Sequence, residues 1–113
     1  MDAWNRADVA AIVAMLSEDA TFSMPPLPTW FRGRDDIAAF LPGILRSTWR
    51  FEAASAGGQP AVIGRRRDPG SGRYELGTVM VCTFEGEQIA AVTAFLGPGV
   101  LGRLRPGEIL RRR

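Results

Sequence analysis

The acidic side chains are the first candidates for chemistry in this sequence, because it contains no histidine that could act as a general base. A carboxyl group can do this work when burial raises its pKa towards neutrality. Only Glu52 and Glu75 fall inside segments with a strand-like pattern, and Glu75 follows Tyr74, so those neighbours should point to opposite faces. Helix starts, turns and chain ends account for the other acids. We therefore predict no catalytic residue.

The absence of histidine also excludes a Ser-His-Asp triad, a Cys-His pair and any metal site that needs imidazole. The single cysteine, Cys82, excludes an internal disulfide and a metal centre built from several cysteines. It lies in an apolar run, which favours a small buried side chain over a reactive thiol. We predict neither a metal nor a cofactor.

The large apolar side chains are more informative than the acids. Most of them must belong to the core, but some could line a hydrophobic pocket between the strand faces and the proline-rich segment 24–30. A buried ionisable pair in that pocket would favour an enzyme, whereas apolar groups, threonine and methionine alone would favour a binding domain. The predicted pocket residues are Phe22, Met24, Trp30, Phe40, Trp49, Phe51, Thr78, Met80, Thr93 and Phe95.

Arginine supplies all 14 basic residues, which against 12 acidic residues leave a net charge of +2. Two runs, 65–67 and 111–113, are the remaining candidates for binding a partner. No aromatic residue interleaves either run as single-strand binders require, and the net charge is small. We interpret both runs as solvated surface and predict no specific nucleic-acid binding.

Two helices and a short strand are expected in the first half of the chain, and they should position the candidate residues of that half. Asp8 is a suitable N-cap for a helix over 9–16, and the alternation over 20–24 predicts a strand that the prolines of 25–28 end. Residues 29–32 should be extended or loop. A second helix should follow Gly33 and end early at Pro42 and Gly43. Its expected buried positions are Ile37, Phe40, Leu41 and Ile44.

The second half changes to a period of two residues, over 47–54, 61–67, 73–84 and 88–96. Turn-forming residues separate these segments, which predicts an antiparallel meander. Helices first and strands later indicate an α+β class with helices on one face of the sheet. A chain of 113 residues should form one domain over 1–113, with a partly irregular tail at 97–113.

The segments 73–84 and 88–96 are apolar on both faces, so the sheet face away from the helices needs a cover. A homodimer or a companion domain would supply it. No segment has the pattern of a signal peptide or a membrane span, and with one thiol this predicts a cytoplasmic protein without membrane contact.

The order of these elements resembles the cone-shaped fold of nuclear transport factor 2 and the SnoaL-like polyketide cyclases. The stretches 2–9, 24–34, 58–61 and 89–96 more specifically resemble the C-terminal SnoaL-like domain of actinobacterial extracytoplasmic-function sigma factors. Met24-Pro25-Pro26 and the Gly-Gln-Pro-Ala stretch at 58–61 carry most of that likeness. The resemblance implies a curved antiparallel sheet with helices on its concave face and a first helix shortened to residues 1–6.

Two functions follow from the resemblance. The first is a non-catalytic regulatory or ligand-binding domain that modulates transcription through protein contacts. Its partners would be a second copy through the sheet, or upstream sigma regions and RNA polymerase, with a small apolar ligand. Arginines 65–67 would then contact an acidic protein surface, and promoter recognition is not expected, because the sigma regions are missing from this sequence. The alternative is a small cofactor-free isomerase, cyclase or epoxide hydrolase acting on an apolar polyketide- or steroid-like substrate.

Overall fold

The computed structural model describes residues 2–28 and 30–97. Within these ranges the elements are, in order, α1 (Asp2–Asn5), α2 (Val9–Ala14), β1 (Leu16–Ser23), β2 (Trp30–Arg32), α3 (Arg34–Ile44), β3 (Trp49–Ala56), β4 (Gln59–Arg67), β5 (Tyr74–Glu85) and β6 (Gln88–Leu96). The α+β class is confirmed. Beyond Gly97, the predicted tail lies outside the described residues.

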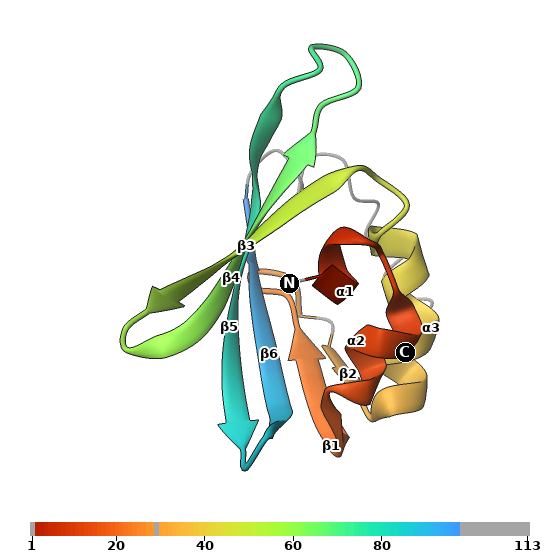
Figure 1. The fold of residues 1–113 in the computed structure, drawn as a ribbon, viewed down its shortest axis with the longest axis vertical. Coiled ribbons are helices and arrows are strands. Elements are labelled where there is room, and N and C mark those ends of the chain that lie inside the picture. Colours follow the sequence, from red (N-terminus) through yellow and green to blue (C-terminus); the bar gives the residue numbers. More distant parts are fainter. Residues whose placement is uncertain (1, 29, 98–113) are drawn as a thin grey trace.

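In the described part of the chain, the strands form one curved sheet in the order β2-β1-β6-β5-β4-β3. The meander from β3 to β6 is antiparallel throughout, as predicted. β1, however, pairs with β6 in parallel, which makes the sheet mixed rather than wholly antiparallel. A parallel pair needs a long connection between its strands, and β2, α3 and the rest of the meander provide it. Figure 1 shows the helices against one side of the sheet and the β4–β5 hairpin projecting at the upper end.

The first predicted helix begins where expected. The Asp8 carboxylate accepts a hydrogen bond from the backbone N–H of Ala11 at 3.1 Å and caps α2. The helix ends at Ala14, before the predicted boundary, because Leu16 already belongs to β1 and is almost completely buried there. Sheet pairing of Leu16 with Ile89 therefore overrides its place in the helical pattern.

The predicted early end of the second helix, at Pro42 and Gly43, is wrong. α3 continues through Pro42 to Ile44, and Pro42 is exposed on its outer side. Ile37, Phe40 and Leu41 are buried on the opposite side. Burial of that stripe offsets the hydrogen bond that proline cannot donate.

The core lies between the helices and the concave face of the sheet. Phe40 of α3 stacks on Phe31 of β2 with ring centroids 4.3 Å apart, and it also contacts Phe22 of β1 at 5.7 Å. The stretch predicted as extended or loop thus forms a short strand that carries Phe31 into the core. No helix among the described residues is long and apolar enough to cross a membrane.

Candidate functional site

A small cavity of about 30 Å³ lies between the concave face of the sheet and the helices. One water molecule needs roughly 10–15 Å³, so the space is limited but real, and its apolar lining suits hydrocarbon better than water. The lining side chains are Trp4, Phe22, Met24, Leu41, Ile44, Trp49, Phe51, Thr78, Met80, Ala94 and Leu96.

Aromatic rings form one wall of the cavity. Phe51 contacts Trp49 and Trp4, each with ring centroids 5.4 Å apart. The Trp49 Nε1–H donates to the backbone oxygen of Ile44 at 3.0 Å, which satisfies its polar edge and fixes the ring. Gly64 lies beneath Phe51, and a Cβ there would come within 2.8 Å of the Phe51 ring. The close approach of this ring to the sheet therefore requires glycine at position 64.

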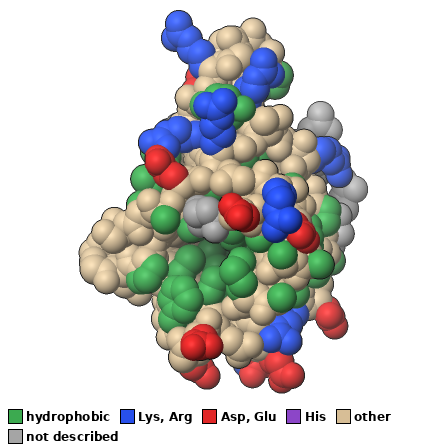
Figure 2. Space-filling model, viewed as in Figure 1, with side chains coloured by type: hydrophobic (Ala, Val, Ile, Leu, Met, Phe, Trp, Pro, Cys, Tyr) green, Lys and Arg blue, Asp and Glu red, His purple; other side chains and the backbone are tan. Residues whose placement is uncertain are grey.

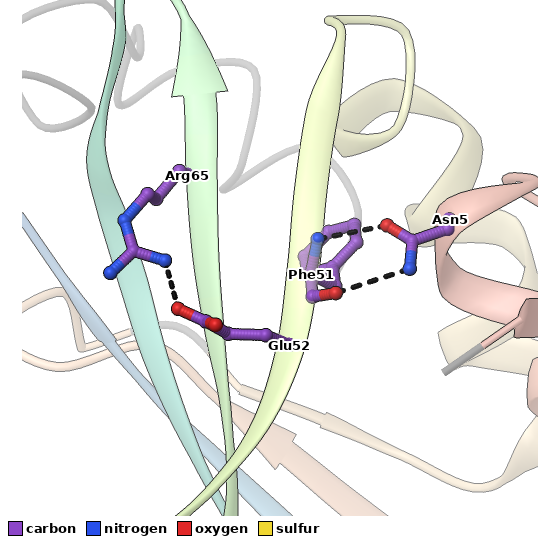
Figure 3. A network of polar contacts seen from close by, with 4 residues as sticks. All are labelled: Asn5, Phe51, Glu52 and Arg65. Atoms are coloured by element: carbon purple, nitrogen blue, oxygen red, sulfur yellow. Dashed lines mark hydrogen bonds and ion pairs between the residues drawn. The ribbon is translucent and has the colours of Figure 1, made fainter.

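The helix α1 is held against the edge strand β3 by Asn5. The Asn5 Oδ1 accepts from the Phe51 backbone N–H at 2.8 Å, and its Nδ2 donates to the Phe51 backbone oxygen at 3.1 Å (Figure 3). Asn5 thus occupies free backbone groups of an edge strand as a neighbouring strand would. This anchor places Trp4, which is only 7% exposed, over the cavity.

Of the described lining residues, only Thr78 has a polar side-chain atom other than the indole nitrogens, and its hydroxyl donates to the Phe95 backbone oxygen at 3.1 Å. None of the lining residues within 2–28 and 30–97 has an acidic or basic side chain. Glu52 and Glu75, the acids predicted within strands, are both exposed, and Glu52 pairs with Arg65 on the side of the sheet away from Asn5 (Figure 3). The strands also contain acids that were not predicted there, because β1 carries Glu18 and Asp19 and β5 ends at Glu85, but none of these lines the cavity. Among the residues that the structure describes, the cavity lining therefore supplies no general acid or base.

The low reactivity expected of the Cys82 thiol follows from its burial. Cys82 lies on the concave face of β5, and desolvation raises the pKa of its thiol. A raised pKa keeps the sulfur protonated and unreactive at neutral pH. The interpretation of Cys82 as a small buried side chain is confirmed.

The cavity brings together part of the predicted pocket, namely Phe22, Met24, Trp49, Phe51, Thr78 and Met80. Phe40 is buried but packs on Phe31 and Phe22 instead of lining the cavity. Trp30 is 48% exposed on β2 and does not line it either. The structure therefore places the predicted pocket residues Trp30 and Phe40 outside the lining of this cavity.

Thr93 and Phe95, which were also predicted to line the pocket, do not line this cavity. Ala94 and Leu96 line the cavity, so their neighbours Thr93 and Phe95 lie on the outer face of β6. Because β6 is apolar on both faces, its pattern could not indicate which face is inward. Trp4 also lines the cavity but was not predicted there, because an isolated helix as short as α1 gives no periodic signal.

The outer face of the sheet carries two rows of side chains across β4, β5 and β6. Ile63, Val79 and Phe95 form one row, because Val79 pairs with each of the other two. The second row is centred on Val81 and consists of Ala61, Val81 and Thr93. Phe95 is 51% exposed, so this uncharged surface reaches solvent at that residue, whereas Ala61 is buried and the other members are partly buried.

The comparisons with known proteins agree with this architecture. The family model of the SnoaL-like domain matches residues 1–92. A nuclear transport factor 2-like protein of unknown function from Burkholderia pseudomallei superposes with a TM-score of 0.66 at 21% identity, covering 91% of this chain and 88% of that one.

Two further solved structures share the fold. A suspected polyketide cyclase from Xanthomonas campestris superposes with a TM-score of 0.60 at 22% identity, covering 99% of this chain and 90% of that one. A nuclear transport factor 2-like protein from Cytophaga hutchinsonii has a TM-score of 0.60 at 15% identity, with coverages of 89% and 86%. No curated protein sequence matches the chain. The chain belongs to the SnoaL-like domain family, with the nuclear transport factor 2-like fold.

Proposed function

We propose that this SnoaL-like domain is a non-catalytic, ligand-binding regulatory module whose cavity takes a small apolar molecule. The observation that carries the proposal is the cavity lining, which consists of hydrocarbon, aromatic and thioether groups and one hydroxyl. Proton transfer by a carboxylic acid needs that acid within reach of the bound molecule. Such a lining can bind apolar surface but cannot move a proton.

The regulatory part of the proposal follows the likeness to the C-terminal domains of sigma factors, which act through protein contacts. The two outer rows on β4, β5 and β6 supply a surface for such contacts. We propose that a second copy of the chain covers them. A two-fold interface sets identical patches against each other, and these rows carry no charge that would oppose this. Sigma regions and polymerase are the alternative occupants.

A second candidate function is a cofactor-free cyclase, isomerase or epoxide hydrolase. The similarity to the suspected cyclase from Xanthomonas campestris favours it, at an identity of 22%. Against it, Glu52 and Glu75 are exposed, and neither lines the cavity. Turnover of an apolar polyketide or epoxide substrate that a cavity-filling variant abolishes would establish this function instead.

Binding of hexan-1-ol, followed by the fluorescence of the cavity tryptophans Trp4 and Trp49, tests the proposed function. We expect saturable binding by the natural chain. Ala94→Leu should fill the cavity and remove binding, because Ala94 lines it. The matched control is Ala91→Leu, on the outer face of the same strand, which should bind normally. Absence of saturable binding by the natural chain would contradict the proposal.

A further inference from the structure

The open side of the cavity can be located from the burial of its lining. Phe22, Met24 and Leu41 are buried and form its floor. Ile44, Trp49 and Leu96 also line it but are only partly buried. A ligand that outgrows the cavity therefore emerges beside these three residues, which we call the rim.

Arg66 lies next to this rim. In the β3–β4 pairing it is directly opposite Trp49, so the two side chains share the concave face. Its Nε donates to the Ser47 hydroxyl at 3.0 Å, and Ser47 belongs to the connection between Ile44 and Trp49. The guanidinium is thereby held at the segment that joins two rim residues.

The charge of Arg66 is not neutralised by an ion pair in the described part of the chain. Glu75 is opposite Arg66 in the β4–β5 pairing, but the two groups form no ion pair within 4.0 Å in this same part. The next arginine, Arg65, differs in both respects: it lies on the outer face and pairs with Glu52 (Figure 3). Arg66 is therefore a half-buried cation beside an apolar cavity.

The surroundings reinforce this charge. Arginine side chains gather at the upper end of the molecule, around the β4–β5 hairpin, with some acidic side chains beside them, and further acidic side chains lie at the lower end (Figure 2). An anion near Arg66 would thus sit in a favourable field.

We propose that Arg66 binds the carboxylate of an amphipathic ligand whose apolar end occupies the cavity. The ligand class is a short alkyl or aryl carboxylate. The cavity volume of about 30 Å³ accommodates only the end of such a chain, and the remainder passes the rim towards the guanidinium. The planar guanidinium suits a carboxylate, which accepts two parallel N–H hydrogen bonds from it. This assignment rests on the proposed ligand-binding function and further specifies that the ligand is an anion.

Hexanoate and hexan-1-ol form a matched pair of probes, because they share the alkyl chain and differ in charge at its end. We expect the natural chain to bind hexanoate more tightly. Arg66→Gln should weaken hexanoate binding roughly fivefold, as for a partly exposed charge pair, and leave hexan-1-ol binding unchanged. Arg65→Gln, one residue along on the other face, is the control and should alter neither. Glu75→Gln removes the competing carboxylate and should strengthen hexanoate binding.

The outcomes separate this inference from the function on which it rests. Equal binding of both probes by the natural chain, or a hexanoate preference that survives Arg66→Gln, would overturn the role of Arg66 and leave the cavity function intact. Failure of both probes would contradict the cavity function and this inference with it. If Arg66→Gln also loses hexan-1-ol, the variant has disturbed the rim or the fold, and Glu75→Gln decides: tighter hexanoate binding supports the assignment and unchanged binding refutes it.

Discussion

At the scale of single residues, Gly64 controls how closely the aromatic wall approaches the sheet. A Cβ at this position would come within 2.8 Å of Phe51 Cε1 and 2.9 Å of Thr78 Cγ2, so both side chains would have to move. We expect Gly64→Ala to lower the free energy of unfolding by about 1–3 kcal/mol, as overpacked cores do. Urea denaturation measures the change.

Gly43 provides the matched control for this substitution. It lies in α3, and a Cβ there would meet no atom within 4 Å. Alanine favours helix over glycine by up to about 1 kcal/mol, so Gly43→Ala should be neutral or stabilising. A Gly64→Ala variant as stable as Gly43→Ala would show that Phe51 does not depend on the glycine.

At the scale of elements, the attachment of α1 to β3 depends on Asn5. Asn5→Ala removes two hydrogen bonds to the Phe51 backbone and frees the edge of β3. We expect a loss of about 1–2 kcal/mol in the free energy of unfolding, and faster hydrogen exchange at the Phe51 amide. Native-state exchange followed by NMR measures both.

The neighbouring residue Arg6 serves as the control for Asn5. Its ion pair with Asp8 is long, at 4.0 Å, and its side chain is 65% exposed. Exposed pairs of this kind contribute little to stability, so Arg6→Ala should leave the Phe51 amide protected. Equal exchange at Phe51 in both variants would mean that α1 is held by Trp4 packing alone.

The elements also show what sequence patterns can and cannot predict. The strands of the meander were predictable, because alternation and turn residues are local signals. The end of α3 was not, because burial of Ile37, Phe40 and Leu41 is a tertiary effect that overrides Pro42. Which face of β6 points towards the core was ambiguous for a related reason, because both of its faces are apolar. Only packing decides that Ala94 points inward and Phe95 outward.

The residues that line the cavity also include some that sequence patterns could predict and some that they could not. Its strand residues, such as Phe51 and Met80, were predictable as large apolar groups at alternating positions. Trp4 was not predicted, because its position depends on the long-range contact between Asn5 and Phe51. The resemblance to a fold with a first helix, here shortened to residues 1–6, was the one available signal.

At the scale of the whole molecule, the outer rows on β4, β5 and β6 predict self-association. Val79 is central, because it pairs with both Ile63 and Phe95. Val79→Glu would place an unpaired charge in the centre of a two-fold interface, next to its own symmetry copy, and burial of such a charge is costly. We expect the natural chain to be a dimer by light scattering and Val79→Glu to be a monomer that retains hexan-1-ol binding. Ala39→Glu, at an exposed position of α3, is the matched control and should remain dimeric. A natural chain that stays monomeric as its concentration is raised would contradict the second copy as occupant, and binding to sigma regions would then be the next test.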